Sequence, residues 1–136
     1  MELSEQIIDR LVAAATAARE RAYAPYSNFA VGAALLLPDG RIIPGCNVEN
    51  ASYGLAICAE RSAVSAAIAS GVQRFDAIAV VADCSPPASP CGACRQVLSE
   101  FGDFPVVLAN LAGERELASV RDLLPGAFHG QLLTRR

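Results

Sequence analysis

The chain has 136 residues, of which 53% are hydrophobic and 18% charged, with a formal net charge of −3. This length predicts a single domain, residues 1–136, with a core large enough to fold without disulfide bonds. Lysine is absent and the basic residues are scattered arginines, so no nucleic-acid partner is expected, because polynucleotides are bound by clustered cations.

The N-terminal part predicts one helix followed by a β-hairpin. Ser4 is a suitable N-cap, and the apolar residues after it recur at helical spacing, which predicts a helix that runs to about Tyr23. Strands are expected over residues 29–37 and 41–48. Between them, Pro38-Asp39-Gly40 has the residue types of a tight turn.

The rest of the chain predicts alternating helices and strands. In chain order we expect a helix at 58–71, a strand at 75–82, a helix at 91–101, strands at 106–109 and 116–120, and a helical turn at 121–125. A hairpin followed by such an alternation predicts an α/β fold. We expect a three-layer α/β/α sandwich with a mixed sheet of about five strands.

The sequence also predicts the cellular location of the protein and whether it associates with membranes or with other subunits. No apolar run reaches the roughly 20 residues of a membrane span, and residues 1–5 are acidic where a secretory leader is basic. We therefore expect no membrane partner and a cytoplasmic location, where cysteines bind metal or perform chemistry. The apolar composition predicts that surface is buried between subunits, because small soluble monomers carry more charge.

Three cysteines form two short motifs, Cys58-Ala59-Glu60 and Pro90-Cys91-Gly92-Ala93-Cys94. The Cys-x-x-Cys spacing suits two ligands of one zinc ion. Both motifs fall at predicted helix starts, where unpaired N–H groups and the helix dipole favour the thiolate form that binds zinc. Cys58, Cys91 and Cys94 are therefore the predicted ligands of one Zn²⁺ per subunit.

Glu60 lies two residues after Cys58, so its carboxyl group is expected beside the metal without being a ligand. Three protein ligands leave a position for water, which zinc acidifies to hydroxide. Glu60 is then the predicted proton shuttle, which acts first as a base and later as an acid. That role requires a desolvated pocket and a pKa near the working pH.

Two arginines are candidates for offsetting the charge of the metal site, because three thiolates leave the zinc centre at a formal −1. Arg61 follows Cys58 by three residues and Arg95 follows Cys91 by four, each on the same helical face as its sulfur. One or both are expected to donate hydrogen bonds to thiolates. Arg61 is favoured because it adjoins the acid, and an ordinary surface arginine is the alternative for each.

Other interpretations of the cysteines remain open. A structural zinc site in a non-catalytic binding module requires a fourth ligand, which Cys46, Cys84 or His129 would have to supply. A Cys-x-x-Cys pair at a helix start is also typical of thioredoxin-like redox proteins. The two motifs together, with a proline before the second, favour the catalytic interpretation.

The motifs resemble those of the cytidine deaminase family, in its small, homotetrameric, three-cysteine form. The resemblance extends over nearly the whole chain, and its specific parts are Ala24–Phe29, Val31–Leu35, Asn47–Asn50, Cys58–Arg61, Pro90–Gln96 and Leu123–Pro125. It implies a zinc-dependent hydrolase that converts cytidine and deoxycytidine to uridine and deoxyuridine plus ammonia, in pyrimidine salvage. It also implies a homotetramer with shared active sites.

The resemblance further implies roles for residues around the metal. Asn47 and Glu49 would bind the ribose hydroxyls, and an amide and a carboxylate two residues apart on an extended segment also point to one side. Phe29 would stack on the pyrimidine, although a core phenylalanine at a strand start is the alternative. The remaining implied contacts with substrate are Ala59 and, from a neighbouring subunit, Ala51, Tyr53 and Phe128.

Relatives that share the zinc motif differ in their substrates. Nucleic-acid-editing and tRNA adenosine deaminases usually carry histidine as the first ligand and need a basic groove, and neither is found in this sequence. Blasticidin-S-type deaminases share the three-cysteine core and are the main alternative. The segment Asn47–Asn50 favours a nucleoside with an intact ribose, and the preference between cytidine and deoxycytidine is left open.

Overall fold

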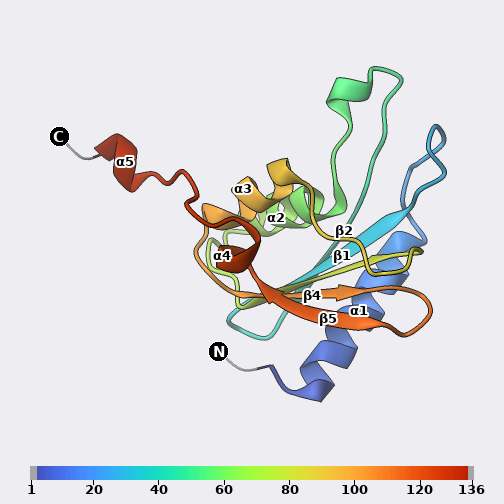
Figure 1. Ribbon diagram of the computed structural model, residues 1–136, viewed down its shortest axis with the longest axis horizontal. Coiled ribbons are helices and arrows are strands. Elements are labelled where there is room, and N and C mark those ends of the chain that lie inside the picture. The colour runs from blue at the N-terminus through green and yellow to red at the C-terminus, as the bar shows by residue number, and fades with distance from the viewer. Residues whose placement is uncertain (1–2, 135–136) are drawn as a thin grey trace.

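The computed structural model describes residues 3–134 and contains one mixed five-stranded sheet (Figure 1). The strands are β1 Val31–Leu36, β2 Ile42–Cys46, β3 Ala77–Ala82, β4 Pro105–Ala109 and β5 Arg115–Ser119. Their order across the sheet is β2-β1-β3-β4-β5. β3 and β4 run parallel, whereas the other neighbouring pairs are antiparallel. The expected mixed sheet of about five strands is confirmed.

Helices cover both faces of the sheet, which gives the three layers expected. α1 (Glu5–Arg19) packs on one face, and α2 (Ala59–Ala69) and α3 (Gly92–Ser99) pack on the other (Figure 1). Successive residues of β1 alternate between the two cores: Ala33 and Leu35 face α2, whereas Ala34 and Leu36 face α1. This alternation follows from the two-residue period of a strand.

Two glycines let the helices approach the sheet closely. A Cβ atom at Gly32 would lie 1.8 Å from the carbonyl oxygen of Ala15 in α1. A Cβ atom at Gly45 would lie 2.5 Å from both the carbonyl oxygen of Ala59 and the N–H nitrogen of Ala63 in α2. Gly45 therefore sets the depth at which the start of α2 sits on the sheet.

The predicted boundaries differ from the structure at the first helix and the second strand. α1 ends at Arg19 rather than near Tyr23, because the backbone of Tyr23 pairs instead with the segment after β2. Its N–H donates to the carbonyl of Asn47 at 3.0 Å, and its carbonyl accepts the N–H of Glu49 at 2.8 Å. β2 itself ends at Cys46 rather than at Val48.

Shorter elements lie outside the sandwich. A 3₁₀ helix, η1 (Tyr53–Leu55), lies on a green segment that projects from the body in Figure 1. The helical turn expected near residues 121–125 is α4 (Val120–Leu123), and a further short helix, α5 (Gln131–Thr134), was not expected. Within residues 3–134, no helix combines the length and apolarity needed to cross a membrane.

Candidate metal centre and active site

Three cysteines from two helix starts come together on the α2–α3 side of the sheet. Cys58 is the N-cap of α2, Cys91 is the N-cap of α3, and Cys94 lies in the first turn of α3. Cys58 and Cys91 were expected inside the first turns, but both have extended backbone and precede their helices. The three Sγ atoms lie within 4.8 Å of one another.

The spacing of the sulfurs fits one zinc ion. Two thiolates that bind a tetrahedral zinc at about 2.3 Å lie about 3.8 Å apart, and the Sγ atoms of Cys58 and Cys91 are separated by 3.7 Å. Within the described residues, neither Cys46, Cys84 nor His129 belongs to the cluster. Three protein donors leave a coordination position open, as in catalytic rather than structural zinc sites.

The thiols differ in acidity. Burial raises the pKa of Cys91, but the N–H of Cys94 and the thiols of Cys94 and Cys58 outweigh it, so the net pKa is lowered. Burial and the neighbouring Glu60 carboxyl group raise the pKa of Cys94. Cys91 is thus the more readily ionised thiol. Metal binding must displace the proton of Cys94, because zinc binds thiolates.

Glu60 is the desolvated acid that the sequence predicts beside the metal site. It is the second residue of α2, and only 4% of its surface is exposed. Burial raises its pKa, against the opposing effects of its own backbone N–H, the Cys94 thiol and Arg61. A carboxyl group with a raised pKa can both accept and return a proton, as a general acid–base catalyst requires.

A cavity of about 300 Å³ lies above the metal site. It brings together most of the site residues predicted from the sequence, namely Phe29, Asn47, Glu49, Cys58, Ala59, Glu60 and Cys91. It is also lined by residues that sequence reasoning missed, Val31, Ala56, Ile57, Val80, Ala88 and Ser89. These side chains belong to no motif, so only the fold assigns them to the cavity.

Phe29 lies at the mouth of this cavity, and 42% of its surface is exposed. It is therefore not the core phenylalanine that was the alternative. Asn47 holds it there: Nδ2 donates to the carbonyl of Phe29 at 2.8 Å, and Oδ1 accepts the N–H of Val31 at 2.8 Å. The amide of Asn47 retains a second N–H for a ligand.

Glu49 also bonds to the loop before β1. Its Oε1 accepts the N–H groups of Tyr26 and Ser27 at 2.9 and 3.2 Å, and its Oε2 accepts the Ser27 hydroxyl. The Ser27 hydroxyl, followed by the two N–H groups, lowers the pKa of Glu49 despite some desolvation. Glu49 is therefore an anion at the cavity wall.

The structure separates the two candidate arginines. Nη2 of Arg61 donates to Sγ of Cys58 at 3.6 Å, and this contact raises the pKa of Arg61. Its buried Nε has no hydrogen-bond partner within residues 3–134. The guanidinium of Arg61 is thus placed to offset thiolate charge.

Arg95 does not donate to a thiolate, which corrects the expectation for this residue. Its guanidinium donates instead to the carbonyl of Pro90, in the loop before α3, at 2.8 Å. It also donates to the carbonyl of Leu123, at the end of α4, at 2.7 Å. A third bond reaches the hydroxyl of Ser89 at 2.7 Å. Arg95 therefore fixes the loop that carries Cys91.

Removal of the Arg61 side chain should weaken the metal site. For Arg61→Ala we expect zinc affinity to fall about 10- to 100-fold, as for other residues that hydrogen-bond to metal ligands. Competition with a chromophoric chelator measures the affinity. We also expect the acidic limb of the pH–rate profile to move upward. An unchanged affinity and profile, equal to those of the exposed-site control Arg74→Ala, would contradict this role.

Three predicted residues lie away from the cavity of their own chain. Tyr53 is 76% exposed on the projecting segment and contacts the ring of Tyr26 edge-on at 6.0 Å, and Ala51 lies on the same segment. Phe128 is 56% exposed, and its carbonyl accepts a bond from Gln96 at 2.7 Å. These positions are compatible with contacts to another subunit, and that role stays a prediction.

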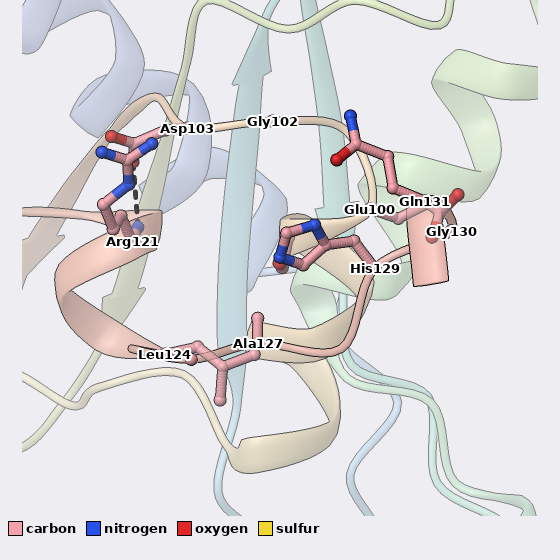
Figure 2. Close-up of a pocket in the computed structure, with 11 residues that line it drawn as sticks. Glu100, Gly102, Asp103, Arg121, Leu124, Ala127, His129, Gly130 and Gln131 are labelled. Atoms are coloured by element: carbon pink, nitrogen blue, oxygen red, sulfur yellow. Dashed lines mark hydrogen bonds between the residues drawn. The ribbon is translucent and has the colours of Figure 1, made fainter. Parts of the chain in front are cut away.

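A second cavity, of about 490 Å³, lies between the end of α3 and the C-terminal segment. Figure 2 shows His129 pointing into it, near Glu100 and Ala127. It is lined by none of the three clustered cysteines. The chemistry therefore belongs to the smaller cavity.

Zinc held by the three thiols would activate water next to Glu60, whose buried carboxyl group can carry the proton of that water, and this is the chemistry of the zinc-dependent deaminases. That is the class of protein that the fold and the site define.

Comparisons with known proteins agree with this class. The family model described as "Cytidine and deoxycytidylate deaminase zinc-binding region" matches residues 5–110. A cytidine deaminase from Sporosarcina psychrophila is 55% identical over 89% of this chain and 90% of its own length. The chain therefore belongs to the cytidine and deoxycytidylate deaminase family.

A solved structure and a more distant relative are also similar to this chain. The crystal structure of a cytidine deaminase from Burkholderia pseudomallei matches with a TM-score of 0.87 and 54% identity, over 93% of this chain and all of the other. A blasticidin-S deaminase from Bacillus cereus is 31% identical over 70% of this chain and 74% of its own length.

Proposed function

We propose that this chain is a zinc-dependent cytidine deaminase, a single-domain hydrolase that converts cytidine and deoxycytidine to uridine and deoxyuridine with release of ammonia. The observation that carries the proposal is the cavity lined by buried Glu60 together with Cys58 and Cys91, which cluster with the fully buried Cys94. Membership of the family and the positions of Phe29 and Asn47 at the same cavity support it.

Each residue of the cavity has its own role in the proposed reaction. Zinc bound by the three cysteines supplies Lewis acidity and acidifies a water molecule. Glu60 takes one proton from the attacking water and delivers it to N3 of the ring. It then takes the remaining proton of the hydroxyl group added at C4 and gives it to the amine, so that ammonia leaves as the C4–N bond breaks and the C4 carbonyl forms. Phe29 stacks on the pyrimidine, and the fully buried Ala59 lines the cavity between Cys58 and Glu60.

The charges of the cavity favour a nucleoside over a nucleotide. Glu49 and Glu60 both line it, whereas no arginine does among the described residues. A 5′-phosphate would approach these carboxylates without a cation to neutralise it, and like charges at a binding site repel. The remaining donors and acceptors of Asn47 and Glu49 suit ribose hydroxyls.

A substrate panel tests this function. An absorbance assay should show turnover of cytidine and deoxycytidine, with kcat/KM for deoxycytidylate at least about 100-fold lower because of like-charge repulsion. Blasticidin S should be a poorer substrate than cytidine. Equal turnover of deoxycytidylate and deoxycytidine would contradict the electrostatic argument, and preference for blasticidin S would favour the alternative activity.

We also infer that the active form is a homotetramer with shared pockets, in which Ala51, Tyr53 and Phe128 reach a neighbouring subunit's site. Large apolar side chains exposed on the segments before β1 and between β2 and α2 support this, namely Tyr23, Tyr26, Val48, Tyr53, Leu55 and Ile57. Activity per chain should fall when dilution produces monomers, as followed by light scattering and assay together. Full activity of a verified monomer would refute shared sites.

The proposed setting is pyrimidine salvage in the cytoplasm. All five cysteines are free thiols, which a reducing compartment preserves. Fractionation of expressing cells should recover the protein with cytoplasmic markers, and recovery outside the cytoplasm would contradict this location.

A further inference from the structure

The Ser27 hydroxyl joins two residues of the cavity. Its Oγ donates to Oε2 of Glu49 and accepts the N–H of Phe29 at 3.0 Å. With the N–H groups of Tyr26 and Ser27 on Oε1, the Glu49 carboxylate receives three donors from two consecutive residues. Charge-assisted bonds of this kind are stronger than bonds between neutral groups.

Both the N–H and the carbonyl of Phe29 are hydrogen-bonded in this network. Ser27 accepts its N–H, and Asn47 donates to its carbonyl at 2.8 Å. Between Ser27 and Phe29 the chain turns through Asn28, whose φ of 58° lies in the left-handed region that asparagine tolerates. The direction of the Phe29 ring at the cavity mouth therefore depends on the bonds of Ser27 and Asn47.

Glu49 stands on the wall between two cavities, so the direction of its carboxylate matters. It lines the 300 Å³ cavity above the cysteines and also an adjacent cavity of about 270 Å³ that includes Tyr26 and Tyr53. The bonds from Ser27 and Tyr26 fix both carboxylate oxygens. Without the hydroxyl, Oε2 loses the side-chain donor that orients it, and the carboxylate can rotate toward either cavity.

A local turn explains only part of these contacts. Serine hydroxyls often accept the N–H two residues later, as Ser27 does from Phe29. The bond to Glu49, which lies 22 residues away in the sequence, is not required by such a turn. It connects the loop before β1 to the segment after β2, at the entrance of the cavity.

We propose that Ser27 is a positioning residue for nucleoside recognition, whose hydroxyl fixes the Glu49 carboxylate and the Phe29 ring in the relative geometry that ribose and base require. This inference rests on the proposed function. Ser27 lies outside the set of residues that line the 300 Å³ cavity. It therefore acts through Glu49 and Phe29 rather than through contact with substrate.

The test compares Ser27→Ala, Ser27→Thr and Glu49→Gln on cytidine and on 2′,3′-dideoxycytidine, which lacks the 2′- and 3′-hydroxyl groups. We expect Ser27→Ala to raise KM for cytidine about 10-fold, with kcat within about 3-fold, because a charge-assisted bond is lost. The effect on dideoxycytidine should be smaller. Ser27→Thr, which keeps the hydroxyl, should restore KM to within about 3-fold of wild type.

A double-mutant cycle separates positioning from general damage. If Ser27 acts partly through Glu49, Ser27→Ala should raise KM less in the Glu49→Gln background than in wild type, because only the bond to the Phe29 N–H is then left to lose. Zinc content and melting temperature of each variant provide the structural control. An unchanged KM, an additive double variant, an equal effect on dideoxycytidine, or a threonine variant as impaired as alanine would overturn the inference.

The same experiment distinguishes this inference from the proposed function. A wild-type protein that fails to deaminate cytidine would overturn both. Wild-type turnover with an unaffected Ser27→Ala variant would overturn only the role of Ser27.

Discussion

The Glu60→Gln variant should deaminate cytidine with a kcat about 10²- to 10⁴-fold below that of wild type, because an amide cannot accept and return the proton. Glutamine has nearly the shape of glutamate, so zinc content and KM should change little. Initial rates from the loss of cytidine absorbance, together with metal analysis, measure both properties.

The melting temperature of the Glu60→Gln variant distinguishes a catalytic role of Glu60 from a structural one. Glu60 is buried and its pKa is raised by that burial, so the fold disfavours its ionised form. Replacing it by a neutral isostere should leave the melting temperature equal to or above that of wild type. A matched control is Glu116→Gln on the exposed part of β5, which should keep full activity. Wild-type turnover by zinc-loaded Glu60→Gln would overturn the mechanism.

The metal centre was predictable because its chemistry is encoded in short stretches of sequence. Cys58 and Glu60 are two residues apart, and Cys91 and Cys94 are three apart. Each motif begins a helix, so local geometry fixes much of each half. The hairpin was predictable for the same reason, since the turn at 38–40 specifies the pairing of β1 with β2.

The loop at the cavity mouth was not predictable, because its contacts are long-range. Helical spacing continues past Arg19 in the sequence, but backbone pairing of Tyr23 with the 47–49 segment ends the helix earlier. The same segment supplies Asn47 and Glu49 to the loop, through bonds that span 16 to 23 residues. Local propensity carries no information about such partners.

The two arginines illustrate the same limit of local pattern. Arg61 and Arg95 have equivalent helical relations to a cysteine. Only Arg61 bonds to a sulfur, because Arg95 finds the carbonyl of Leu123, 28 residues away, at the end of α4. Helical spacing defines which face an arginine occupies, and the tertiary partner decides what it binds.

Replacing a single ligand should remove the metal. For Cys94→Ala we expect zinc to fall from about one ion per chain to below about 0.1, because two thiols remain and zinc sites need at least three protein ligands. Turnover should fall at least about 10³-fold, since the acidified water is lost with the metal. Metal analysis after dialysis, followed by assay with and without added zinc, measures both effects.

Cys84→Ala is the matched control, because Cys84 is a partly buried free thiol outside the cluster. It should retain zinc and activity. Loss of zinc in this variant would identify Cys84 as a fourth ligand and would support the structural-zinc alternative. Retention of zinc by Cys84→Ala together with its loss from Cys94→Ala would mean that three thiols hold the ion. The remaining coordination position would then face the cavity that Glu60 lines, where water can be activated.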